Sequence, residues 1–135
     1  RHFQFSFDSP DSQSWQRAYA ISVERWGEAV GLPVAHCLLK ILQALGRCRR
    51  EGITFQDPLC PQSRNFASED EYWLIQMLHH MRREETSGAR VALEKLTMGR
   101  MDPDVIRTGL YFGSRFSCGT ADKQKHRMPP DLRLV

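Results

Sequence analysis

Apolar residues recur with helical spacing along most of this 135-residue chain, and this pattern constrains the fold more than any other feature. The clearest case is the segment 34–51, where apolar residues recur in alternating steps of four and three. They are Val34, Leu38, Ile41, Leu45 and Cys48. Residues with this spacing form a stripe along one side of an α-helix, which another element must cover. The sequence predicts an ordinary core helix here, because these positions span only about two heptads and a coiled coil requires more.

Helix-start signals divide the chain further. Ser9, Ser68 and Asp102 each have the side chain of an N-cap residue, and Ser9 and Asp102 each precede a proline. Ser68 and Glu71 also fit a capping box, in which each side chain accepts a hydrogen bond from the other residue's backbone N–H. The segment 31–33, Gly-Leu-Pro, predicts the end of a first helix and the start of a second.

These signals, with no alternation of strands and helices, predict a mainly all-α fold. We expect a small four- to five-helix bundle that forms a single domain over residues 9–119. Gly109 and Gly113 form a GxxxG pattern in the last expected helix, which predicts that another helix backbone approaches closely there. Residues 120–135 are polar and basic and contain proline, so they predict a flexible tail.

The first eight residues follow a different pattern. Phe3, Phe5 and Phe7 alternate with polar residues, which is the period of a half-buried strand. We therefore expect residues 1–8 to form an extended arm. No comparable strand follows in the chain, which leaves three interpretations: the arm lies across the helices, pairs with the same segment of a second copy, or joins the sheet edge of a partner.

Composition and motifs exclude several classes of function. The formal net charge of +3 is too small to indicate nucleic-acid binding by itself. No apolar run approaches the roughly 18 residues that span a membrane, so no membrane association is expected. No two of the four cysteines form a C-x-x-C pair, which favours reduced thiols in a cytoplasmic protein. Glycine-rich phosphate-binding motifs and the G-x-S-x-G nucleophile motif are absent from the sequence.

Adjacent histidines at positions 79 and 80 are the most obvious candidates for metal or acid–base chemistry. Neighbouring residues on a helix point about 100° apart, so His79 and His80 do not share a site by helical spacing. His80 and Glu84 form the one pair with the i, i+4 spacing of helical metal ligands, and no third ligand accompanies them. The sequence therefore predicts no metal, no cofactor and no catalytic residue.

The expected helix after Ser68 carries two apolar stripes. Leu74, Ile75, Leu78 and Met81 form its predicted core face. Trp73, Met77 and His80 project on another side, where they either pack against this chain or contact a partner.

We therefore expect a small non-enzymatic helical module for protein–protein interaction. Its regulatory role would be that of an adaptor, inhibitor or anti-activator that sequesters a partner such as a transcription regulator. The partner is a different protein or a second copy in a dimer. The expected contact residues are Phe3, Phe5, Phe7, Trp73, Met77 and His80. One alternative is a metal- or cofactor-binding protein or enzyme that uses histidines and cysteines.

The other alternative is a nucleic-acid-binding module that uses arginine clusters such as Arg47, Arg49 and Arg50. Such a module requires basic groups that converge with exposed aromatic residues, and no stretch of the sequence places them together. The sequence thus makes nucleic acid the less favoured partner.

Overall fold

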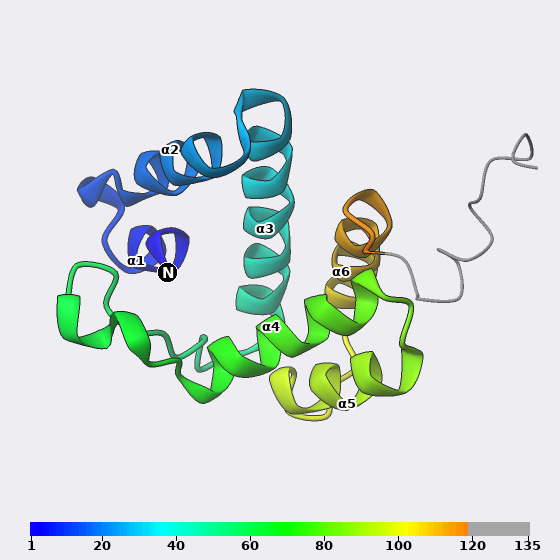
Figure 1. Cartoon of the computed structure of the whole chain (residues 1–135). Coiled ribbons are helices and arrows are strands. Elements are labelled where there is room, and N and C mark those ends of the chain that lie inside the picture. The colour runs from blue at the N-terminus through cyan, green and yellow to red at the C-terminus, as the bar shows by residue number, and fades with distance from the viewer. Residues whose placement is uncertain (119–135) are drawn as a thin grey trace, which may run out of the picture.

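The computed structural model describes residues 1–118, and within them all regular elements are helical (Figure 1). The all-α class is therefore confirmed for this part of the chain. Its six α-helices are α1 (His2–Asp8), α2 (Ser14–Trp26), α3 (Glu28–Cys48), α4 (Glu69–Arg82), α5 (Thr86–Leu96) and α6 (Pro103–Arg115). Short 3₁₀ turns lie at Pro10–Ser12 and Pro61–Asn65. The tail predicted at 120–135 lies outside the described residues.

Helix α3 occupies the centre of the fold. Helices α1 and α2 lie on one side of it and α6 lies on the other, while α4 runs past its C-terminal end and α5 packs on α4 (Figure 1). The stripe predicted over 34–48 is in the core: Ile41 and Leu45 are fully buried, and Val34 and Cys48 are nearly so. A central helix that is apolar on more than one side needs neighbours on each side, and this explains the arrangement.

Helix α3 also meets a simple test for a membrane span. It has 21 residues, and an 18-residue window of it has a mean hydropathy of 1.5. The expectation that no segment is long and apolar enough was based on unbroken apolar runs, which His36 and Lys40 interrupt. The core helix of a soluble protein passes the same test, and 44% of this window is buried against the rest of the chain.

The prediction of an extended arm at residues 1–8 is wrong, because residues 2–8 form helix α1. Phe3 and Phe7 lie four residues apart, so the same phenylalanines also fit helical spacing. Even a short helix forms some backbone hydrogen bonds within itself, here from Phe5 N–H to Arg1 O and from Ser9 N–H to Phe5 O, whereas a lone strand forms none. Phe3 is buried against Ala35 and Leu42 of α3, and its ring meets the edge of Tyr19 at a centroid distance of 5.5 Å.

The predicted break between the first two long helices also lies elsewhere. Helix α2 ends at Trp26 and is capped by Gly27, whose φ of +75° favours glycine, and α3 then runs through Pro33 without a break. Gly31 has a different role from the expected helix stop. A Cβ at this position would lie 2.3 Å from the Ser22 carbonyl oxygen, so Gly31 permits α2 and α3 to pack closely.

The start of α4 agrees with the sequence. The Ser68 side chain accepts a hydrogen bond from the Glu71 backbone N–H, and Glu71 accepts one from the Ser68 backbone N–H, so the capping box is confirmed. Arg1 donates from Nε to Glu71 at 2.5 Å. The capping carboxylate therefore also anchors the beginning of the chain to α4.

A buried ion pair joins α3 to α4. Arg49 donates from Nη1 to Asp70 Oδ1 at 2.5 Å and to the Leu96 carbonyl oxygen at 3.2 Å. The other oxygen of Asp70 accepts from both the backbone N–H and the hydroxyl of Thr54. Burial alone would raise the pKa of Asp70, but the hydrogen bonds from Arg49 and Thr54 outweigh it and lower that pKa.

The GxxxG pattern of α6 faces α4. A Cβ at Gly113 would lie 2.8 Å from the backbone oxygen of Met81, and one at Gly109 would lie 2.6 Å from the Met81 sulfur. The close approach that the sequence predicted is therefore confirmed, and its partner is the last turn of α4.

We predict that Gly113→Ala destabilises the fold, although alanine favours a helix by about 1 kcal/mol over glycine. The added methyl group would press against backbone, which cannot rotate away as a side chain does. Overpacking of this kind costs about 1–3 kcal/mol. Urea denaturation measures the change. Gly46→Ala in α3 is the matched control, since nothing lies within 4 Å of its added Cβ, and it should be neutral or stabilising. Equal effects of the two variants would contradict the packing role of Gly113.

We also predict that Asp70→Asn lowers the free energy of unfolding by about 3 kcal/mol at neutral pH, because it leaves the buried Arg49 charge unpaired. Since folding lowers the pKa of Asp70, the carboxylate's contribution is complete above its unfolded pKa of about 3.9 and is lost as the pH falls through the lower folded value. The difference between wild type and variant should thus shrink in acid. Arg107→Gln, which breaks an exposed ion pair, should cost about 0.5 kcal/mol or less.

Candidate functional site

An apolar groove of about 710 Å³ lies where the α2–α3 corner, α4 and α6 meet. Trp26 and Val30 form one wall, and Ile75 and Leu78 of α4 form another. The floor contains Val34 and Phe112, which are almost fully buried. Hollows of this size and character are typical of ligand and partner sites.

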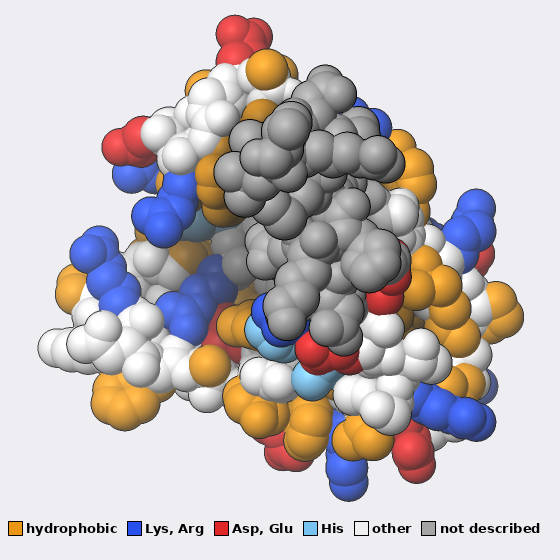
Figure 2. Space-filling model, turned by 45° about the vertical axis from the view of Figure 1, so that its right-hand side comes forward, with side chains coloured by type: hydrophobic (Ala, Val, Ile, Leu, Met, Phe, Trp, Pro, Cys, Tyr) orange, Lys and Arg blue, Asp and Glu red, His pale blue; other side chains and the backbone are white. Residues whose placement is uncertain are grey.

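The groove walls expose large apolar side chains that the fold leaves uncovered. Exposure reaches 49% for Trp26, 45% for Val30 and 59% for Ile75. Single exposed apolar residues are normal, but three around one hollow indicate a surface that another molecule can cover. Figure 2 shows that apolar side chains reach the surface in several patches among charged groups.

The rim of the groove carries positive charge. Arg82 lines it and holds its position by donating from Nε to the Phe116 carbonyl oxygen at 2.6 Å. His79 also lines it and is exposed to solvent. No aspartate or glutamate is among the described residues that line the groove. A ligand with an apolar face and negative charge beside it complements this lining.

Helix α4 does not present the predicted stripe of Trp73, Met77 and His80 as one exposed surface. Met77 is fully buried in the core, so it cannot contact a partner without rearrangement of the helices. Trp73 is half-buried against the same core, and His80 is half-buried beside Glu85. Conversely, Ile75 was expected in the core and is exposed. The reason is that α5 and α6 pack on the Met77 side of α4.

The predicted phenylalanines at the start of the chain are also separated. Phe3 is in the core and Phe5 is half-buried, whereas Phe7 is 43% exposed. Phe7 lines a smaller hollow of about 480 Å³ with the aromatic rings of Trp15 and Tyr19. Of the six predicted contact residues, Phe7 is therefore the one that is exposed.

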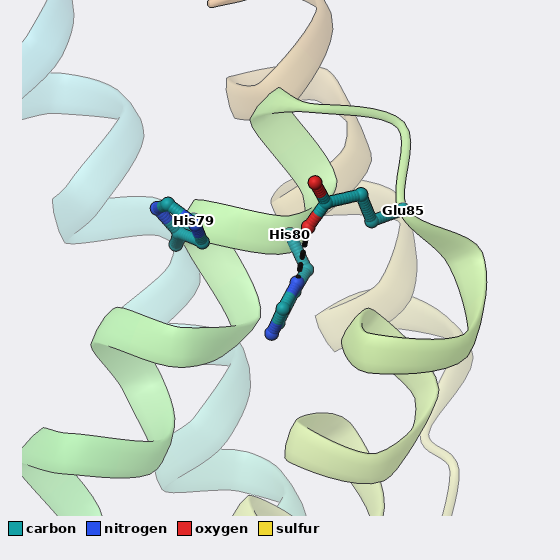
Figure 3. Close-up of side chains that lie close together, drawn as sticks. All are labelled: His79, His80 and Glu85. Atoms are coloured by element: carbon teal, nitrogen blue, oxygen red, sulfur yellow. Dashed lines mark hydrogen bonds and ion pairs between the residues drawn. The ribbon is translucent and has the colours of Figure 1, made fainter. Parts of the chain in front are cut away.

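Histidine and acidic side chains meet beside the groove at the end of α4. One potential ligand atom from each of His79, His80 and Glu85 lies within 4.8 Å of those of the other two. Helical spacing had indicated His80 with Glu84, but the hydrogen bond from His80 Nδ1 reaches Glu85 at 2.6 Å. Figure 3 shows this contact and shows the His79 ring pointing away from the Glu85 carboxylate.

The surroundings of this cluster disfavour a metal ion. Both carboxylate oxygens of Glu85 are engaged, one by His80 and the other by Arg83 Nε at 2.9 Å. These contacts, Arg83 first, lower the pKa of Glu85. Arg83 also adds positive charge beside the cluster, which repels a cation. The cluster therefore acts as a charged contact between the end of α4 and the start of α5.

The cysteines offer no reactive centre among the described residues. Burial raises the pKa of Cys37 and Cys48, which keeps both thiols protonated and poorly nucleophilic. Hydrogen bonds with Ser63 lower the pKa of Cys60, but the groups that contact this thiol in the loop before α4 are Ser63 and Gln62, neither of which is a base. All four cysteines are free thiols.

No protein-family model matches this sequence, and no similarity to a curated protein or to a solved structure was found. The groove therefore has to be interpreted from its own geometry and chemistry.

We predict that stoichiometric Zn²⁺ leaves the thermal midpoint of the protein unchanged. A tight site would raise the midpoint, because a ligand at 100 times its dissociation constant adds about 2.7 kcal/mol of stability. Differential scanning fluorimetry with and without Zn²⁺ measures this effect. An increase that disappears in His80→Ala would show that the cluster does hold a metal ion. His36→Ala, a substitution of an exposed histidine on α3, is the control for nonspecific binding.

Proposed function

We propose that this protein is a small helical module for protein–protein interaction and that its groove holds an amphipathic helix of a partner protein. The observation that carries the proposal is the groove itself, with Trp26, Val30 and Ile75 exposed around an apolar floor. Binding of an amphipathic helix in such a groove is a common mode of recognition.

The chemistry of the lining defines the partner. Its apolar residues should recur at helical spacing, so that they fill the groove between the α2–α3 corner and α4. Its flank should be acidic, because the Arg82 guanidinium lies at the rim and no carboxylate is among the described residues that line the groove. Burial of the large exposed side chains would supply affinity, and the charges would set orientation.

A regulatory role is consistent with this proposal. A module of this size would act by covering the apolar face of a helix that its partner needs elsewhere, as an adaptor, inhibitor or anti-activator does. A transcription regulator is one such partner. The proposal needs no catalytic residue and no cofactor.

A synthetic peptide tests the groove directly. Its sequence should place leucines at i, i+3, i+4 and i+7 and glutamates elsewhere, and fluorescence anisotropy should report its binding. Ile75→Glu should weaken binding at least tenfold, because it replaces an apolar contact worth about 1.5–3 kcal/mol with a buried charge. Exchange of the peptide glutamates for lysines should also weaken it.

Val91→Glu provides the matched control, since Val91 of α5 is 52% exposed and does not line the groove. It should bind the peptide like wild type. Equal binding by the two variants, or none by wild type, would overturn the proposal. Light scattering tests whether the groove instead binds a second copy of this chain. A dimer that Ile75→Glu dissociates and Val91→Glu preserves would assign the groove to that second copy.

A further inference from the structure

A cleft of about 580 Å³ lies between α3 and α6, and the proposed interaction with a partner helix does not use it. On α3, Val34 and Leu38 face the apolar groove, whereas His36 and Lys40 line this cleft. Residues two positions apart on a helix point about 200° apart. The cleft and the groove therefore lie on opposite sides of α3.

Helix α3 contributes a row of polar side chains. His36, Lys40, Gln43 and Arg47 follow one another at steps of four, three and four, which keeps them on one face. The row is about 16 Å long, since each residue advances the helix by 1.5 Å. It offers two permanent cations and an amide donor along its length.

Helix α6 contributes a second row on the other wall. Arg107 and Thr108 line the cleft, and Tyr111 stands one turn further along with 55% of its side chain exposed. Arg115 donates from Nη1 to the Tyr111 hydroxyl at 3.3 Å, so another cation stands at this end. The two rows thus place cations and an exposed aromatic ring around one hollow.

The cleft is electropositive. No carboxylate is among its described lining residues. Asp104 lies at the edge, where it accepts from Arg107 at 2.8 Å and stands 4.0 Å from Arg47. Both pairs are more than half exposed, and pairs of this kind contribute little energy. An anion that binds Arg47 and Arg107 more strongly than the Asp104 carboxylate does can therefore replace Asp104 as the partner of both arginines.

We propose that the α3–α6 cleft binds single-stranded nucleic acid, with phosphates along the two cationic rows and a base stacked on Tyr111. A basic groove with an exposed aromatic platform is how proteins bind single strands. Duplex DNA does not fit as well, because its bases expose only their edges, whereas a single strand can stack a base on Tyr111. The cations come from two helices far apart in sequence, which is why no basic run in the chain indicates the site.

Fluorescence anisotropy of the full chain with a labelled oligothymidylate of about twelve nucleotides tests the proposal. Contacts from Lys40, Arg47 and Arg107 to three phosphates predict that log K falls with log salt at a slope of about −2. Absence of binding at about 50 mM salt, or binding that does not respond to salt, would overturn it.

Two double variants distinguish binding in the cleft from attraction by the overall positive charge of the protein. Lys40→Gln with Arg107→Gln should weaken binding at least about tenfold at low salt and reduce the slope by about 1.4. Arg90→Gln with Lys95→Gln removes the same charge from exposed positions on α5, which does not line the cleft. This control should bind like wild type, and an equal loss in both double variants would overturn the assignment. Residues 119–135 are the same in every protein compared.

Two further variants test the chemistry. Asp104→Asn should strengthen binding, because it removes the carboxylate that competes for Arg107, whereas Glu94→Gln on α5 should not. Tyr111→Ala should weaken the oligonucleotide complex at least about fivefold and leave the binding of inorganic polyphosphate unchanged. No effect of Tyr111→Ala on the oligonucleotide, or equal loss for polyphosphate, would overturn the role of the ring. Duplex DNA that binds more tightly than the single strand would overturn the assigned ligand.

Discussion

The buried pair between Arg49 and Asp70 is the constraint on which the arrangement of the helices depends. It joins the end of α3 to the first turn of α4, and through Thr54 and the Leu96 carbonyl oxygen it also fixes the intervening loop and the end of α5. Removal of two charges from water is costly, and the attraction between them offsets this cost only with good geometry and further hydrogen bonds. Asp70 has these hydrogen bonds, whereas Arg49 Nε is buried without a partner among the described residues.

Close contacts at glycines then set the spacing between the helices. Gly31 brings α3 against α2, and Gly113 brings α6 against α4, in both cases onto backbone atoms. Gly88 of α5 lies under the His80 ring, where a Cβ would be 2.5 Å from Nδ1. Packed interiors do not adjust by small continuous deformations. These glycines, with the ion pair, therefore determine how far apart the walls of the groove stand.

Local signals in the sequence were sufficient for much of the helical framework. The capping box at Ser68 and the N-cap at Asp102 mark real helix starts, since such bonds involve residues only two or three apart. The boundary near Gly31 was wrong because a glycine serves equally for a helix end and for close packing. The prediction of an extended arm at residues 1–8 was wrong because, in so short a segment, the spacing of Phe3 and Phe7 fits both the period of a strand and that of a helix.

The candidate site was harder to predict, for a physical reason. Helix α4 is apolar on several sides, so which of Met77 and Ile75 is buried depends on where α5 and α6 pack. The groove combines Trp26, Ile75 and Phe112, which lie on different helices and share no local pattern. A signal existed in the apolar residues at the α2–α3 corner, yet without the neighbouring helices they are indistinguishable from core residues.

Both proposed surfaces use the same two helices. Val34 of α3 and Phe112 of α6 form the floor of the groove, while Lys40 and Arg107 of the same helices line the cleft. The groove and the cleft share the distance between α3 and α6. A ligand in one of them that changes this distance therefore also changes the shape of the other. Any such coupling must be reciprocal, because each ligand shifts the affinity for the other by the same factor. A helix seated in the groove and a strand in the cleft would then be linked through the spacing of α3 and α6, with no direct contact between the two ligands.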